Sequence, residues 1–334
     1  MSERHRDVLN TVVRQFILTA QPVSSLTVAG KAVGASSATI RNVMAELEAA
    51  GLLKQQHTSG GRIPTANGYR TFVNGLTTPP LDYRSEEEFS RAIEESNALG
   101  ETILNRFASV LASASHLIGV VLSPRLDRGI LEHIELLQVA DERLLLVVTL
   151  REGMVKTIFI ELPVRVSAGE IVGLTRLINE RLSGVQLSTL QSEANVRLAD
   201  TGLASSELVR LILSGAESLF GMPSQSIAGA GHALDQPEFR HPDKLKTVIE
   251  LLEGKDILLH LLENEDIGND VRVRIGVESG IEAAKELSCV TANYRVGDLS
   301  GTIGIIGPTR MDYPRQMALV GLAANLLSKM QNKF

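Results

Sequence analysis

Apolar residues recur at every third or fourth position in three segments near the N-terminus, residues 4–18, 25–33 and 38–51. This spacing places them on one face of an α-helix, so it predicts three amphipathic helices that pack together. Gly34 favours a tight turn between the second and third helices, and either Ser36 or Ser37 is suited to cap the third. The pattern is typical of a helix-turn-helix.

The third predicted helix has two distinct stripes. Its apolar stripe, expected to be buried, comprises Ile40, Val43, Met44 and Leu47. The opposite stripe is small or polar and comprises Ala38, Arg41, Asn42 and Ala45. Gly51 favours the end of this helix. Two short strands, Leu52–Gln56 and Arg62–Pro64, are then predicted around a turn at residues 57–61. Because a hairpin in this place is a wing, residues 1–76 are expected to form a winged helix-turn-helix domain.

Beyond residue 76 the pattern changes several times. Pro79 and Pro80 mark a boundary because neither can continue a helix. Helical spacing follows from Ser85 to Ser115, and Ser85 and Glu88 have the spacing of a capping box. Four β-rich runs then predict an antiparallel meander, at residues 117–122, 130–139, 143–150 and 154–162. The elements expected further along are helices within 167–220, a helix at 241–262, strands at 271–278, 288–294 and 301–306, and a last helix at 314–330.

This order of elements predicts an α+β fold interrupted by an insertion. The expected division is a winged-helix domain at 1–76, the first part of an α+β domain at 77–162, an inserted and mainly helical domain at 163–240, and the second part of the α+β domain at 241–334. The leucines and isoleucines of the insertion belong either to its own core or to a dimer surface.

The charge of the chain is unevenly distributed. Its 334 residues carry a net charge of −6, which taken alone argues against a nucleic-acid partner. Residues 1–76, however, have a net charge of +4, whereas the remainder has −10. A basic N-terminal segment on an acidic body suggests an interaction module. No apolar run approaches the ~20 residues that span a bilayer, and no signal peptide is visible, so a cytoplasmic protein without a membrane partner is expected.

The exposed stripe of the third helix offers side chains that can read DNA bases. Arg41 can bond guanine with two donors, Asn42 can pair with adenine, and the Ala38 methyl can contact that of thymine. Thr39 lies at the same N-terminal end, which enters the major groove in such domains. The candidates on the wing for phosphate or minor-groove contacts are Lys54, His57, Thr58 and Arg62. The alternative is an ordinary solvated helix face, since two glutamates of the helix dilute the positive charge.

The rest of the chain shows no catalytic constellation. The histidines lack metal-ligand spacing, Cys289 is expected in the core, and no phosphate-loop or nucleophile motif occurs, so neither an enzyme nor a cofactor or metal is predicted. Glycines between 297 and 307 fit a closely packed strand better than a phosphate loop. For the polar cluster at residues 309–313, capping of the last helix by Asp312 is favoured over an interdomain contact or an effector pocket.

Three long blocks of the sequence resemble the HrcA family of heat-inducible transcription repressors. They are GASSATIRNVMAELEAAGLLKQQHTSGGRIPTANGYRTFV, PEFRHPDKLKTVIELLE and YRVGDLSGTIGIIGPTRMDYPRQMALV. The blocks lie in the family's order, and the resemblance covers essentially the whole chain. The turn region departs from the family pattern at Leu26, where an arginine is usual.

The resemblance implies a winged-helix domain, a GAF-like domain and an inserted dimerising domain. It implies a homodimer that binds an inverted-repeat operator, called CIRCE, upstream of chaperonin and DnaK-type operons, with the GroEL chaperonin as a partner. The residues that it places in the recognition helix are Ser37, Thr39, Arg41 and Asn42. Those that it places in the wing and its flank are His57, Thr58, Arg62, Tyr69 and Arg70.

Two other functions stay open from the residues alone. One is a winged-helix regulator that responds to a small metabolite bound in the GAF-like domain. The other is an enzyme with an appended DNA-binding domain, which the missing catalytic constellation disfavours.

Overall fold

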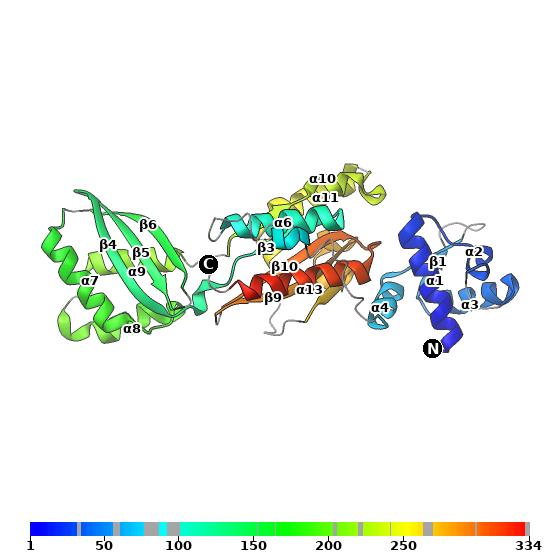
Figure 1. Ribbon diagram of the computed structural model, residues 1–334, viewed down its shortest axis with the longest axis horizontal. Helices are drawn as coiled ribbons and strands as arrows, with labels where there is room; N and C mark the ends of the chain where they lie inside the picture. Colours follow the sequence, from blue (N-terminus) through cyan, green and yellow to red (C-terminus); the bar gives the residue numbers. More distant parts are fainter. Residues whose placement is uncertain are drawn as a thin grey trace.

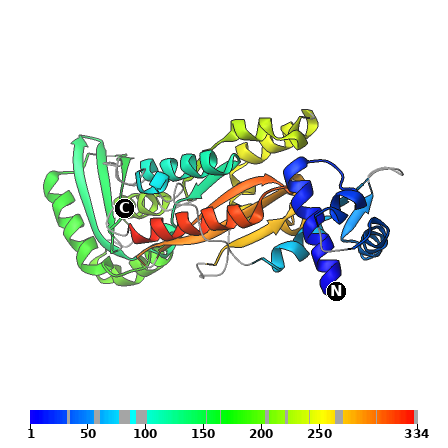
Figure 2. The same cartoon turned by 45° about the vertical axis from the view of Figure 1, so that its right-hand side comes forward.

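The computed structural model describes residues 1–31, 35–55, 61–76, 87–91, 101–151, 153–163, 165–202, 206–219, 223–240, 242–262, 270–297 and 299–330. Three units lie in a row along the long axis (Figure 1). We call them the head, which holds α1–α4, the central domain, which holds the largest sheet, and the distal unit, which holds β4–β6 and α7–α9. The view in Figure 2 shows the same order, with the central domain between the other two.

The head confirms the predicted winged helix-turn-helix. Its elements are α1 (Glu3–Thr19), α2 (Ser25–Ala29), α3 (Ser37–Ala49), β1 (Leu53–Gln55), β2 (Arg62–Pro64) and α4 (Ala66–Asn74). Ser36 is the N-cap of α3, and Gly51 takes a φ of 71° just after its end, as the sequence suggested. α2 is shorter than the expected 25–33 because Gly30, a poor helix former, caps it. The turn around Gly34 lies outside the described residues.

The central domain is built on a five-stranded antiparallel sheet of order β7-β3-β10-β9-β8. Its strands are β3 (Ile118–Leu122), β7 (Gln225–Ala228), β8 (Arg272–Ile275), β9 (Leu287–Val296) and β10 (Leu299–Pro308). Helices α6 (Glu101–Ser115) and α13 (Tyr313–Lys329) pack on one face, and α11 (Pro242–Glu253) and α12 (Lys255–Leu262) pack on the other. The short α10 (Ala230–Asp235) follows β7. Strands covered on both faces are apolar along most of their length, which explains the β-rich pattern of β9 and β10.

Alternate residues of the two central strands serve different cores. Val290 and Ile305 are paired and belong to the core under α6 and α13. Cys289 and Ile306 are paired and belong to the core under α11 and α12, and burial raises the pKa of the Cys289 thiol to about 11. Gly301 lies opposite the Tyr294 ring, where a Cβ atom would come within 2.4 Å of it. Close packing is therefore the reason for a glycine in this strand, as predicted.

The distal unit is a three-stranded antiparallel sheet with helices on one face. It comprises β4 (Leu131–Ala140), β5 (Arg143–Leu150), β6 (Val155–Glu161), α7 (Ala168–Leu182), α8 (Leu190–Arg197) and α9 (Glu207–Leu219). The inward residues of the strands and the apolar stripes of the helices form one core, which Leu299 at the start of β10 joins. Asn179 of α7 bonds both backbone groups of Ile134, each at 2.7 Å, which satisfies an edge of β4.

The expected domain division is wrong at two places. The boundary between residues 162 and 163 cuts through the distal unit, because β4–β6 pack on the helices that follow them and not on the central sheet. β7 lies within the expected insertion but pairs with β3. The predicted four-stranded meander is likewise divided, since β3 pairs with β10 and β7 while the other three strands form their own sheet.

Two expected helices also differ in detail. The helix predicted at 241–262 is divided into α11 and α12 at Gly254, a residue that weakens helices. The helix predicted from Ser85 to Ser115 is seen at 87–91 and in α6, while Ser85, Pro79 and Pro80 lie outside the described residues. Within the described part of the chain, no helix is long and apolar enough to cross a membrane.

Candidate nucleic-acid interface

The start of α3 is fixed by the hydroxyl groups of four residues. The Ser36 side chain accepts a hydrogen bond from the Thr39 amide at 3.2 Å and lies 2.9 Å from the Thr39 hydroxyl. The Ser37 hydroxyl lies 3.2 Å from that of Ser25, which ties α2 to α3. The predicted site residues Ser37 and Thr39 therefore position the helix, whatever else they contact.

The outward stripe of α3 is exposed as predicted. Ile40, Val43, Met44 and Leu47 are buried in the core of the head. Ala38, Arg41, Asn42 and Ala45 are exposed. A stripe of two small residues with an arginine and an asparagine can approach the edges of DNA bases closely, because the alanines leave room and the longer side chains carry the donors and acceptors.

Both acidic residues of α3 face basic partners within the head. Glu46 Oε2 lies 2.6 Å from His5 Nε2 of α1, and Glu48 Oε2 accepts a hydrogen bond from Arg62 Nε of β2 at 2.8 Å. The two carboxylates therefore link α3 to the helix behind it and to the wing. Glu48 is thus paired with a guanidinium group and Glu46 with an imidazole ring.

The wing is the predicted two-stranded hairpin, and an isolated bridge joins its second strand to Val23. Lys54 pairs with Ile63 in the β1–β2 register, and the amide and carbonyl of Val23 bond those of Arg62, each at 2.9 Å. Gly61 is required there, because a Cβ atom would come within 2.5 Å of the Val23 backbone. Lys54 is exposed on β1, as its proposed phosphate contact requires. His57 and Thr58 lie outside the described residues.

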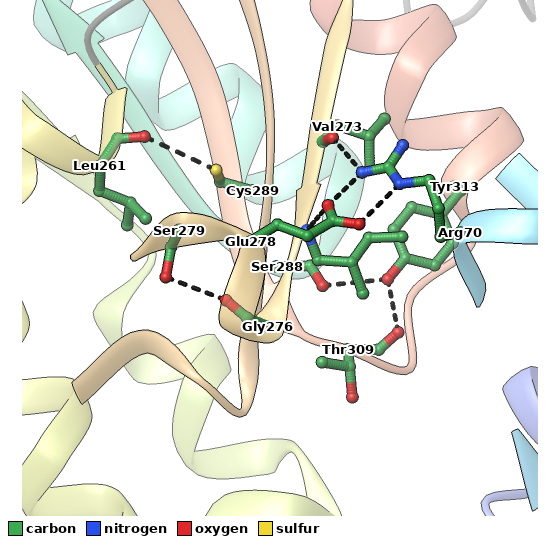
Figure 3. A network of polar contacts seen from close by, with 11 residues as sticks. Arg70, Leu261, Val273, Gly276, Glu278, Ser279, Ser288, Cys289, Thr309 and Tyr313 are labelled. Carbon is green, nitrogen blue, oxygen red and sulfur yellow. Dashed lines mark hydrogen bonds and ion pairs between the residues drawn. The ribbon is translucent and has the colours of Figure 1, made fainter. Parts of the chain in front are cut away.

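Two predicted DNA-contacting arginines have partners inside the protein. Arg62 is half-buried and braces the wing against α3 through Glu48. Arg70 of α4 donates to Glu278 Oε1 at 2.7 Å, to Glu278 Oε2, and to the Val273 carbonyl at 2.6 Å (Figure 3). The structure thus places Arg70 between the head and the central domain. An arginine fork suits a carboxylate as well as a phosphate, and in this structure it is Glu278 that engages Arg70.

The Arg70–Glu278 pair is electrostatically favourable to both groups. The hydrogen bond to Glu278 raises the pKa of Arg70 above its ordinary value. Burial alone would raise the pKa of Glu278, but the hydrogen bonds from Arg70 and from the Ile275 amide outweigh it and hold that pKa below its ordinary value. Both side chains therefore stay charged at neutral pH.

Sequence reasoning missed a second arginine at this boundary. Arg310 of the central domain donates through Nη1 to the Ile17 carbonyl of α1 at 2.7 Å and through Nε to Glu238 at 2.5 Å. In the cluster at residues 309–313, Asp312 does cap α13, as favoured, while Arg310 makes the interdomain contact that was the less favoured alternative. The concentration of polar residues between a buried strand and a helix was the available signal.

The described residues contain no group of three or more histidine, cysteine, aspartate or glutamate side chains that could hold a metal ion. The candidate interface therefore consists of the exposed stripe of α3 and of Lys54 on the adjoining wing.

Comparisons with known proteins bear on both parts of the chain. The chain matches a family model described as "Winged helix-turn-helix transcription repressor, HrcA DNA-binding" over residues 1–77 and one described as "HrcA protein C terminal domain" over residues 101–317. A solved structure described as that of a hypothetical protein shares the fold, with a TM-score of 0.65 and 23% identity over the whole of both chains.

Similarity to curated relatives covers nearly the full length of the chain. The heat-inducible transcription repressors HrcA of Chlorobium phaeobacteroides (strain BS1) and Chlorobium chlorochromatii (strain CaD3) are each 36% identical, over 98% of this chain and 97% of theirs. That of Thermoanaerobacter pseudethanolicus is 34% identical, over 99% of this chain and 98% of its own. Fold and site thus define a winged-helix DNA-binding transcription repressor. The chain belongs to the HrcA family of heat-inducible transcription repressors.

The brace between Glu48 and Arg62 can be tested by amide hydrogen exchange. Replacing either residue by glutamine is expected to speed exchange at residues 61–64, by lowering the free energy of local opening by about 1 kcal/mol. The double variant should show little further loss, because both single changes remove the same contact. Lys54→Gln is the matched control and should leave exchange unchanged. Slow exchange retained in Arg62→Gln would show that Arg62 does not brace the wing.

Proposed function

We propose that this chain represses transcription as a homodimer on an inverted-repeat operator of the CIRCE type, upstream of chaperonin and DnaK-type operons, until heat releases it. The observation that carries the proposal is the exposed stripe of Ala38, Arg41, Asn42 and Ala45, on a helix whose two glutamates are engaged by His5 and Arg62 of the head. The family to which the chain belongs supports the repressor function and its heat response.

We assign base reading to α3 and backbone contacts to the wing. Arg41 is suited to guanine, Asn42 to adenine, and the Ala38 methyl to thymine. The exposed Lys54 is our candidate for a phosphate contact, and His57 and Thr58 are added on the family resemblance. Arg62 and Arg70 are assigned to support of the head instead, because their guanidinium groups already meet carboxylates.

An inverted repeat requires two heads related by two-fold symmetry, and the distal unit offers a surface for that dimer. The face of its sheet away from the helices carries a row in which Leu137, Leu145 and Phe159 are paired across the strands. Leu137 is 43% exposed and Phe159 is 50% exposed. Arg143 and Glu161 are paired beside this row, and a two-fold partner would bring the same charges to the opposite side. We propose that this sheet face is the homodimer interface.

The GroEL chaperonin is the partner that the family resemblance implies for recovery of the repressor. We propose that it acts on chains released from the operator after heating, in the cytoplasm. The apolar sheet face of the distal unit would be uncovered if the dimer separated, and exposed apolar surface is what makes unassembled chains prone to associate.

The metabolite-responsive alternative finds less support. The central domain has an open groove of about 410 Å³ between α11 and the segment at residues 282–287. Its lysines meet carboxylates of the same groove, Lys244 with Glu286 at 2.6 Å and Lys285 with Glu282 at 2.5 Å. These pairs leave little uncompensated charge to select a ligand.

Replacement of Arg41 by alanine tests the DNA assignment. We expect the change to cost about 1–3 kcal/mol of binding free energy per half-site and to relax the preference at one base position. Fluorescence anisotropy on an inverted repeat and on single-base variants of it, at several salt concentrations, measures both effects. Arg176→Ala is the matched control, since Arg176 is an exposed arginine of the distal unit. Unchanged affinity and sequence preference in Arg41→Ala would refute the assignment.

The dimer surface is tested by placing charge on it. The double variant Leu137→Asp/Phe159→Asp should sediment as a single chain at concentrations where the wild type sediments as two, because burying carboxylates in an apolar interface is costly. Val196→Asp is the control, since Val196 is a 75% exposed residue of α8 in the same unit. A dimer that survives the double substitution would place the interface elsewhere.

A further inference from the structure

The boundary between the head and the central domain contains two arginine clamps that point in opposite directions. Arg70 reaches from the head to Glu278 and the Val273 carbonyl of the central domain. Arg310 reaches from the central domain to the Ile17 carbonyl of the head, while Glu238 holds its guanidinium group. We call these two clamps, with the tyrosine pair between them, the joint.

Each clamp is built for fixed geometry. Glu278 takes two donors of Arg70 and also accepts the Ile275 amide at 2.8 Å, so its carboxylate cannot turn freely (Figure 3). The Arg310 side chain is only 14% exposed. Its bond to Ile17 falls in the last turn of α1, where carbonyl groups lack helical partners and a positive charge is favoured.

A buried tyrosine pair lies between the clamps. The rings of Tyr69 in α4 and Tyr313 in α13 are 5.8 Å apart at an angle of 56°. Tyr313 is held in turn, since its hydroxyl donates to the Thr309 carbonyl at 2.7 Å and lies 3.0 Å from the Ser288 hydroxyl. The pKa of Tyr69, raised by burial, also responds to Tyr313, Arg310 and Glu238, which places these groups together.

The joint acts on both parts of the DNA-reading surface. Arg310 holds α1, whose apolar stripe packs on α3 and whose His5 meets Glu46 of α3. Arg70 belongs to α4, where Gly68 allows the Leu52 backbone at the start of the wing to approach closely. Two attachments at separate elements with a packed ring pair between them restrict rotation as well as translation. The direction of α3 relative to the central domain is therefore set at the joint.

We propose that the joint determines the spacing between half-sites that the repressor accepts, with Arg70, Glu278 and Arg310 as positioning residues that do not touch DNA. This inference rests on the proposed function, because spacing has meaning only for a dimer with two heads. A rigid head accepts only a narrow range of half-site distances and rotations. A loosened head can reach other arrangements, but it binds the natural operator more weakly because its orientation must be fixed on binding.

The test compares operators whose two half-sites are separated by the natural spacer and by the same spacer lengthened by 5 base pairs. About half a helical turn is then added, which moves one half-site to the opposite face of the duplex. For the wild type we expect the insertion to weaken binding by about 100-fold, to the affinity of a single half-site. For Arg70→Glu and for Glu278→Arg we expect a penalty below about tenfold, with weaker binding to the natural spacer.

The charge-swapped double variant Arg70→Glu/Glu278→Arg should recover part of the spacing penalty, because the pair is restored in reverse. Arg70→Lys, which keeps the charge but not the fork, should lie between the wild type and Arg70→Glu and remains available if the reversals do not fold. Arg176→Glu, which breaks an exposed pair in the distal unit, is the control and should keep the wild-type penalty.

A wild-type penalty in Arg70→Glu, Glu278→Arg and Arg70→Lys alike would overturn the inference while leaving the proposed function intact. Tighter binding of the reversed variants to the natural operator would also overturn it, because the joint would then restrain the heads in an arrangement that disfavours DNA. A wild type that does not prefer any inverted repeat to scrambled DNA would overturn the proposed function and this inference together.

Discussion

A single hydrophobic core runs from the head into the central domain, and the position of the recognition helix depends on it. Val8, Val12 and Ile40 of the head belong to the same cluster of buried residues as Val290 and Ile305 of the central sheet. Apolar packing of this kind is non-directional, so by itself it leaves the head some freedom to turn. The charge-assisted bonds of Arg70 and Arg310 supply the direction, because an arginine fork accepts a narrow range of geometries.

The same division between packing and direction recurs inside the head. The apolar stripe of α3 holds the helix in place, while Glu46 and Glu48 fix it to α1 and to the wing. Residues 1–76 have a net charge of +4 and the remaining residues −10, so the head is basic although the chain as a whole is acidic. Few phosphate contacts per head are then expected, and affinity must come from two half-sites bound at once.

Local patterns in the sequence were sufficient to predict the head and most strands of the central sheet. The stripes of α3, its Ser36 cap and the Gly51 ending follow from spacing within one turn or two. Local patterns do not predict to which sheet a strand belongs, since β3 pairs with β10, which lies far along the chain. Periodicity carries no information about such pairing, so the strands of the distal unit were assigned to the wrong domain.

The candidate site shows the same limit. Exposure of Arg41 and Asn42 was predictable from the helical stripe, whereas the partners of Arg62 and Arg70 were not, because the residue type does not reveal whether a phosphate or a carboxylate will meet it. The structure shows that Arg41 is exposed, whereas Arg62 and Arg70 are paired with carboxylates that support the fold.

Hydroxyl-radical footprinting of the full-length protein on an inverted-repeat operator tests the central claim most directly. The claim is that two heads, each held by the central domain in one direction, bind both half-sites together. It predicts two protected patches on the same face of the duplex that are related by the operator's symmetry and appear at the same protein concentration. A single protected half-site, or two patches that saturate at clearly different concentrations, would contradict it.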